Sequence, residues 1–169
     1  NSMLKLRESE ERFRTLISET PEVGVGLYIG KELRIQYVND VMLKFWSKDN
    51  SIIGKTMKES LPVLEGQPFF DQLEKVFTHG IPFVGREVKA ELEVDGTLQP
   101  VYFNYTYKPL RNSQGEIYAI HHMAVDVTEQ VKNKLALIQS EENVKRLFEQ
   151  TPVGIALFQG RSLTIEIAN

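Results

Sequence analysis

The 169-residue sequence predicts an α+β domain: a five-stranded antiparallel sheet with inserted short helices, flanked by N- and C-terminal amphipathic helices. Three observations lead to this fold class. Five segments have the alternation or the turn boundaries of strands, and a stretch with helical spacing separates the second from the third. Both ends of the chain repeat apolar residues at intervals of three and four, which is typical of amphipathic helices.

The first helix is predicted at residues 3–20. Its seam, which includes one glutamate layer, is Met3, Leu6, Glu10, Phe13, Ile17 and Thr20. Pro21 ends this helix, because the residue before a proline avoids helical backbone angles. Strands at 23–29 and 33–38 follow as a hairpin, and Asn39 is expected to cap the short helix after them.

The middle of the chain is predicted to be helical. Residues 51–66 are short irregular helix and loop, because Gly54, Pro62 and Gly66 break any longer helix. Residues 67–77 have apolar residues at helical spacing and are predicted to form a longer helix.

The other three strands are predicted at 82–94, 99–109 and 116–126. Asp95-Gly96, between the first two, is a strong hairpin turn. Residues 112–115 form the second turn.

The last helix is expected to open at a capping box, Asp126-Val127-Thr128-Glu129, in which the Asp126 carboxylate accepts from the backbone amide of Glu129. The helix should run to about residue 150, and its second half repeats the seam of the first helix. We expect the two seams to form a homodimer; the alternative is an amphipathic helix packed on its own sheet. The apolar residues assigned to the dimer seam are Leu6, Phe13, Ile17, Leu137, Val144 and Phe148.

The opening of the chain occurs twice, since residues 140–169 repeat the sequence of residues 9–39 with one residue fewer. A repeat of this length indicates a modular array. The predicted domains are an N-terminal helix at 1–20, one complete module at 21–127, a signalling or linker helix at 128–151 and the first strands of a second module at 152–169. Because an isolated hairpin is marginally stable, 152–169 is expected to be ordered by pairing with another chain.

Several strings, in this order and spacing, resemble the PAS family with its C-terminal PAC, or D-[IV]-T, motif. They are Thr20-Pro21, Tyr37-Val38-Asn39, Ile52-Ile53-Gly54-Lys55, Gly85-Arg86-Glu87-Val88, Lys108-Pro109-Leu110-Arg111 and Asp126-Val127-Thr128-Glu129. The sequence looks most like the PAS modules strung in tandem in bacterial sensor histidine kinases. The resemblance covers residues 8–130 and, as the start of a second PAS domain, 139–169.

The resemblance implies a sensory module of a two-component phosphorelay that controls a downstream kinase in cis through a coiled-coil helix. Asp126, Thr128 and Glu129 would then transmit the signal, and this segment itself would not be an enzyme. Two alternatives stay open: a ligand-free structural module for dimerisation and signal relay, and a PAS module of a diguanylate cyclase.

Composition limits the partners and cofactors. The net charge of −3 predicts no nucleic-acid partner, and no apolar run long enough to span a bilayer occurs, so we expect a cytoplasmic segment without membrane contact, although its parent could be anchored. The absence of cysteine excludes a flavin-cysteinyl adduct. Heme is not expected, because residues 67–78 contain none of the histidines that heme-binding members use; the cofactor is otherwise unknown.

Aromatic side chains between the helices and the sheet are the candidates for lining a ligand pocket. The alternative is that the same side chains fill the core and leave no pocket. His121 and His122 are neighbours on a strand, so one is expected to face the core and the other the outer surface. The pocket candidates are Trp46, Phe70, Phe83, Phe103, Tyr105 and His121. No catalytic or metal-binding set is predicted.

Overall fold

The computed structural model describes residues 2–19 and 22–150. The chain forms two compact units, 1–128 and 129–169. The predicted strands at 152–169 lie outside the described residues.

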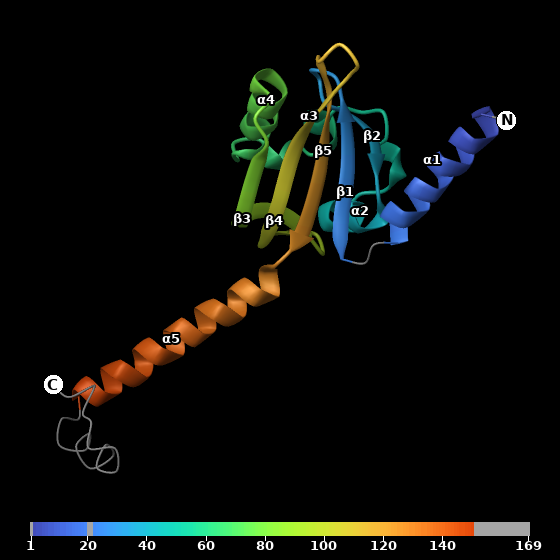
Figure 1. Cartoon of the computed structure of the whole chain (residues 1–169). Coiled ribbons are helices and arrows are strands. Elements are labelled where there is room, and N and C mark those ends of the chain that lie inside the picture. The colour runs from blue at the N-terminus through green and yellow to red at the C-terminus, as the bar shows by residue number, and fades with distance from the viewer. Residues whose placement is uncertain (1, 20–21, 151–169) are drawn as a thin grey trace, which may run out of the picture. The chain divides into compact units, whose positions relative to one another are not determined.

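The predicted α+β fold class is confirmed (Figure 1). The elements are α1 (Ser2–Glu19), β1 (Val23–Ile29), β2 (Arg34–Val38), α2 (Asp40–Trp46), the 3₁₀ turn η1 (Asn50–Ile52), α3 (Met57–Ser60), η2 (Pro62–Leu64), α4 (Phe69–His79), β3 (Phe83–Val94), β4 (Thr97–Arg111), β5 (Ile117–Asp126) and α5 (Thr128–Gln150).

The five strands form one antiparallel sheet in the order β2-β1-β5-β4-β3. Strand β5, the last in sequence, is therefore the central strand. The β3–β4 turn is the predicted Asp95-Gly96 hairpin, and both residues have positive φ angles, of 51° and 80°. The structure adds a bulge in β3 between Gly85 and Val88, where Glu87 has a φ of 49°, which alternation alone did not predict.

The core lies between one face of the sheet and the helices inserted between β2 and β3 (Figure 1). Aromatic and aliphatic side chains from both layers interlock there. The largest fully buried side chains are Tyr28, Ile35, Met42, Leu61, Leu73 and Ile120. Burial of this apolar surface is the main stabilising contribution to such a two-layer fold.

The segment before α3 covers the open edge of β2. The backbone N–H of Ile35 donates to the carbonyl of Lys55 at 2.9 Å, and the N–H of Gly54 donates back to Ile35 at 2.8 Å. The N–H of Met57 donates to the carbonyl of Leu33 at 3.0 Å. These bonds satisfy backbone groups that an edge strand would otherwise expose to another chain.

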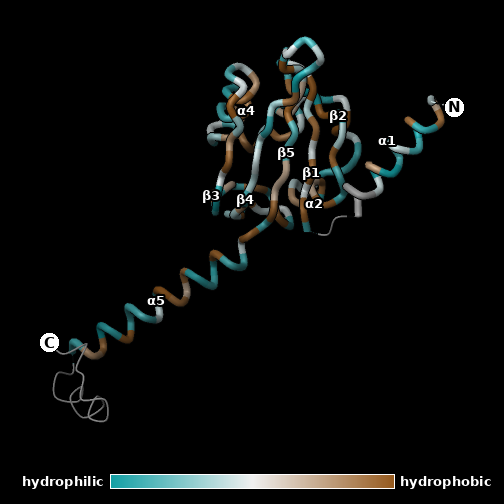
Figure 2. Tube along the Cα trace, in the orientation of Figure 1, coloured by the Kyte–Doolittle hydropathy of each residue, from teal (hydrophilic) through white to brown (hydrophobic). Residues whose placement is uncertain are grey.

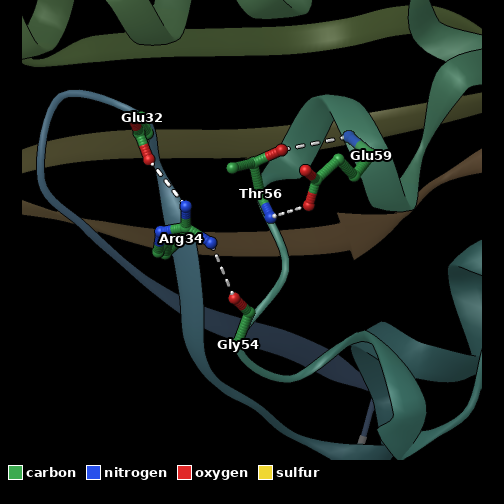
Figure 3. Close-up of polar contacts among 5 residues, drawn as sticks. All are labelled: Glu32, Arg34, Gly54, Thr56 and Glu59. Atoms are coloured by element: carbon green, nitrogen blue, oxygen red, sulfur yellow. Dashed lines mark hydrogen bonds and ion pairs between the residues drawn. The ribbon is translucent and has the colours of Figure 1, made fainter.

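Side chains support the same junction (Figure 3). The Arg34 guanidinium donates to the Gly54 carbonyl at 3.1 Å and to the Glu32 carboxylate at 2.8 Å. Thr56 and Glu59 form a reciprocal capping box at the start of α3. The exposed Arg34–Glu32 ion pair adds little stability by itself, so the backbone bonds and the cap hold the junction.

Helix α5 begins at Thr128, and the predicted cap is wrong in its partner. The Asp126 carboxylate accepts from the backbone N–H of Thr128 at 2.8 Å and from the Thr128 hydroxyl, in place of the amide of Glu129. The reason is that Thr128 is already helical, so Asp126 lies one position before the cap.

Hydrophobic residues recur between hydrophilic ones along α1 and α5 (Figure 2). In the described part of the chain, no helix has the length and hydrophobicity needed to cross a membrane.

Candidate functional site

A cavity of about 40 Å³ lies in the core between the sheet and the inserted helical segments. The part of its lining that comes from described residues is almost entirely apolar and contains no charged side chain. The lining residues are Met42, Phe45, Trp46, Leu64, Phe69, Ala90, Leu92, Phe103, Tyr105, His122 and Ala124. This volume has room for roughly three water molecules, at about 10–15 Å³ each.

His122 reaches the cavity from the centre of the sheet. It pairs with Gly26 of β1 on one side and with Tyr107 of β4 on the other. Tyr28 lies two residues after Gly26 on the same face of β1, and its hydroxyl lies 2.6 Å from Nδ1 of His122. A Cβ atom on Gly26 would lie 2.6 Å from the Tyr28 oxygen, so only glycine lets the tyrosine reach the histidine.

Both members of this pair are neutral at physiological pH. Burial lowers the pKa of His122 to about 3, with a smaller contribution from His121. Burial also raises the pKa of Tyr28 well above its usual value, with Tyr107 adding to the effect. A neutral phenol holds one hydrogen, which it can donate to Nδ1 of His122.

Nε2 of His122 has no hydrogen-bond partner in the part of the chain that the structure describes. It is the one buried side-chain polar atom in this situation among the described residues. Buried polar atoms are normally paired, so an unpaired nitrogen on a ring that lines a cavity needs a physical explanation.

Tyr105 connects the cavity to α4. Its hydroxyl donates to Oε1 of Gln72 at 2.6 Å, and its ring stacks on Phe83 with 5.7 Å between centroids. Burial raises the pKa of Tyr105 to about 12, although the Gln72 bond acts in the opposite direction. The tyrosine is therefore neutral and fixed from two sides.

The structure places the predicted pocket residues in different positions. Trp46, Phe103 and Tyr105 line the cavity. The ring of Phe83 stacks on the ring of Tyr105, and Phe83 lines a separate open groove beside α4. Phe70 is buried elsewhere, with the Lys58 ammonium 5.9 Å above its ring.

The assignment of His121 to the pocket is wrong, because the strand phase is the opposite one. His122 lines the cavity, whereas His121 is half-buried and pairs with Leu27 and Lys108. Burial and the Lys108 charge lower the pKa of His121.

Most of the lining was absent from the predicted pocket, including Met42 and Ala124, and so was Tyr28, which bonds to His122. The spacing of Gly26 and Tyr28 was a usable signal, because a glycine two residues before a large strand residue leaves space on the same face. No sequence signal distinguished Met42 or Ala124, since both are ordinary core residues.

Strand β5 carries His122 near its middle and ends at the start of α5. There the hydroxyl of Thr128 accepts from the backbone N–H of Tyr102 at 2.9 Å and donates to Asp126. The N–H of Val127 donates to the carbonyl of Tyr102 at 2.8 Å. The first residue of α5 is thus attached to β4 as well as to β5, and Glu129 follows as its second residue.

Four of the predicted seam residues are exposed, namely Leu6, Phe13, Leu137 and Val144. Phe148 is half-buried on α5, and Ile17 lies on α1. Among the described residues, no group of histidine, cysteine, aspartate or glutamate side chains has the arrangement of a metal site.

Residues 23–132 match the family described as PAS fold. Three solved structures similar to this chain are those of the PAS domain from Bordetella pertussis BvgS, of a sensory box histidine kinase/response regulator from Burkholderia thailandensis E264, and of VqmA bound to DPO. Their sequences are 22%, 19% and 20% identical to this one, and each TM-score is 0.54.

The alignments cover 80% of this chain and 98% of that chain for BvgS, and the same shares for the Burkholderia protein. For VqmA they cover 68% of this chain and 56% of that one. These similarities agree with the five-stranded sheet and its inserted helices. Since the family match spans more than half of the sequence, the chain belongs to the PAS fold family.

Proposed function

We propose that this chain is a sensory module of a two-component sensor histidine kinase, which couples the state of the core cavity to a downstream kinase in cis through α5. One observation carries the proposal. Strand β5 holds His122, which lines the cavity and whose Nε2 is unpaired among the described residues, and the same strand ends at the bonded Asp126–Thr128 junction. A change at the cavity therefore has a short covalent route to the first turn of the helix.

Other parts of the proposal rest on the sequence and on the relatives. The Burkholderia protein is described as a histidine kinase/response regulator, which supports a phosphorelay as the context. Exposed seams on α1 and α5 support a homodimer. We infer that the segment is cytoplasmic, has no catalytic activity of its own and acts only through its partners.

The repeat supports a tandem arrangement. Residues 140–150, in α5, match the end of α1, so the helix that leaves this module resembles the helix that enters it. We infer that residues 126–129 are the family's C-terminal motif and that a second PAS domain begins after α5.

A ligand-free relay is the second candidate, and the small volume of the cavity favours it. About 40 Å³ is far below the roughly 300–1,000 Å³ of pockets that enclose drug-sized molecules. In that case the core would only transmit force between modules, and the cavity would be a packing defect.

A chimeric kinase tests the proposal and separates the candidates. Residues 1–150 would be joined, in heptad register, to the dimerisation and catalytic core of a histidine kinase, and autophosphorylation from ATP would be measured. Ala124→Leu fills the cavity from β5 and should change the rate at least threefold, whereas Lys89→Leu, on exposed β3 surface, should not.

An unchanged rate in the folded Ala124→Leu chimera would favour the relay. A rate that does not respond to Thr128→Val either would contradict signalling through α5. Overpacking a core costs about 1–3 kcal/mol of folding stability. Thermal unfolding of each variant is therefore the control that checks whether the fold is retained.

A further inference from the structure

The hydrogen on the His122 ring can be assigned from its neighbours. Among the described residues, the one hydrogen-bond partner of the Tyr28 hydroxyl is Nδ1 of His122, at 2.6 Å. If the phenol donates, Nδ1 is the acceptor and the ring hydrogen lies on Nε2. If Nδ1 carried the hydrogen instead, both the phenol hydrogen and the Nε2 lone pair would be buried without partners. The first arrangement leaves one unpaired group and the second leaves two, so the first is favoured.

The ring of His122, which is one of the lining residues, therefore carries a hydrogen-bond donor without a partner. The Nε2–H belongs to a side chain that is 6% exposed, and the cavity wall that it joins is apolar. A molecule in the cavity that offers an acceptor would satisfy this N–H. A molecule that offers only a donor would force the ring into the other tautomer and leave the Tyr28 hydrogen unpaired.

Charge and size narrow the occupant further. No lysine or arginine among the described residues lines the cavity, so a carboxylate or phosphate would be buried without a counter-charge, which is strongly unfavourable. The volume of about 40 Å³ limits the occupant to roughly three or four non-hydrogen atoms, if one water needs about 10–15 Å³.

We propose that this cavity takes a small uncharged molecule with a carbonyl-type hydrogen-bond acceptor, and that the Nε2–H of His122 donates to it. The proposal rests on the proposed sensory function, since it names the ligand class of that same site. Tyr28 is then a positioning residue: it does not line the cavity, but its hydroxyl sets which ring nitrogen carries the hydrogen.

The ring of Tyr107 is the competing partner. Its centroid lies 4.7 Å from that of His122, with 62° between the planes. An N–H pointing at this ring would be partly satisfied by the π-electrons, and the cavity would lose its donor. An N–H···π contact is weaker than a bond to an oxygen, so an acceptor that fits should displace it.

The test is a titration of the full chain with acetone, which has four non-hydrogen atoms and one acceptor. Two-bond ¹H–¹⁵N spectra of ¹⁵N-histidine-labelled protein report which nitrogen of His122 is protonated. We expect a neutral ring with the hydrogen on Nε2, and acetone should move the Nε2 resonance saturably. Methyl resonances of Met42 and Ala124, both in the lining, report occupancy independently.

Two probes of similar shape are the controls. 2-Methylpropene lacks the oxygen, so it should shift the methyl resonances and leave Nε2 unmoved. Acetate carries a charge and should not bind.

Variants test the donor. His122→Phe should lower the affinity for acetone, relative to that for 2-methylpropene, by roughly three- to tenfold, the effect of one neutral hydrogen bond. The matched variant Tyr107→Phe removes a hydroxyl from another buried ring that touches His122, and it should leave this ratio unchanged.

A ring protonated on Nδ1 would overturn the proposal, as would acetone that binds without moving Nε2 or fails to bind. None of these results would contradict the proposed sensory function if Ala124→Leu still changed the autophosphorylation rate of the chimeric kinase. The converse result is that acetone binds at His122 while the kinase activity of the chimera responds neither to acetone nor to Ala124→Leu. That result would support the proposed ligand site and contradict the proposed sensory function.

Discussion

Asn39 connects three parts of the fold through one buried side chain. Its Oδ1 accepts from the backbone N–H of Val25 at 2.9 Å and from that of Met42 at 3.0 Å. Its Nδ2 donates to the carbonyl of Val23 at 2.8 Å. The predicted helix cap is confirmed, and the same amide also ties α2 to Val23 and Val25 of strand β1. An asparagine offers the acceptor and the donor that this geometry needs on two separate atoms, whereas an ionised aspartate has no donor.

Asn39→Ala should destabilise the protein by about 2–4 kcal/mol, because it removes a helix cap and leaves buried backbone groups unpaired. Urea unfolding measures the change. The matched control is Asn112→Ala, since Oδ1 of Asn112 also accepts two backbone N–H groups, from Gln114 and Glu116, but in an exposed turn. Water replaces those bonds, so the control should lose less than about 1 kcal/mol. Equal losses would contradict the role assigned to burial at Asn39.

The neutral His122 makes stability depend on pH. The folded pKa of about 3 lies below the ordinary value of 6.5, so between these values the unfolded chain binds a proton that the folded chain does not. Stability is therefore unaffected above about pH 6.5 and falls as the pH decreases through this window, by about 1.4 kcal/mol per pH unit.

Unfolding free energies at pH 7 and pH 5 measure this effect. Wild type should lose about 2 kcal/mol more than His122→Phe, which cannot titrate at this position. His121→Phe is the matched comparison, and its difference from wild type should be smaller, because His121 is only half-buried. An identical loss in wild type and His122→Phe would show that the imidazole is protonated in the folded state.

At the scale of elements, the junction between β5 and α5 depends on one hydroxyl. Thr128 accepts from the Tyr102 amide and donates to Asp126, so β4, β5 and the first turn of α5 share its Oγ1. Because β4 and β5 pair along their length, a shift of either strand reaches this oxygen. This geometry is what would couple the sheet to the helix.

Thr128→Val keeps the β-branched shape and removes the hydroxyl. It should cost about 1 kcal/mol and increase hydrogen exchange at the Tyr102 amide, whose acceptor is lost. Thr106→Val, on the same strand as Tyr102, is the control and should change exchange little. Undiminished protection of the Tyr102 amide in Thr128→Val would mean that the hydroxyl does not hold the junction.

Most element positions followed from sequence, because turn chemistry and alternation are local. Asp95-Gly96 fixed the β3–β4 hairpin, and Asn39 marked the start of α2. The bulge at Glu87 was missed because it depends on how β4 pairs with β3: the Glu87 amide bonds to the side chain of Asn104. Contacts between strands distant in sequence do not show in a local pattern.

The phase of β5 was missed for a related physical reason. An edge strand with one wet face shows which side is buried, but β5 is central and apolar on both sides. Ile120, His122 and Ala124 face the core, while Ala119 and Met123 alternate with them, and composition cannot distinguish the two sets. For this reason the sequence assigned His121 to the pocket, whereas His122 lines the cavity.

At the scale of the whole molecule, two helices carry apolar residues in the same repeat and leave them exposed. Leu6 and Leu137 are each 61% exposed. Large apolar side chains in a periodic row indicate an interface, whereas scattered ones do not. The glutamate layer at Glu10 and Glu141 would weaken such an interface and restrict its register.

Sedimentation of the full chain tests the predicted dimer. Wild type should be a dimer in the micromolar range, and Leu137→Glu with Val144→Glu should make it monomeric, because four like charges would then be buried in the seam of each dimer. The matched control, Gln139→Glu with Asn143→Glu, adds the same charge to exposed α5 positions outside the seam and should remain dimeric. If both double variants dissociate, charge alone is responsible; if neither does, the contacts that hold the two chains together lie outside this part of α5, and the seam does not carry the dimer.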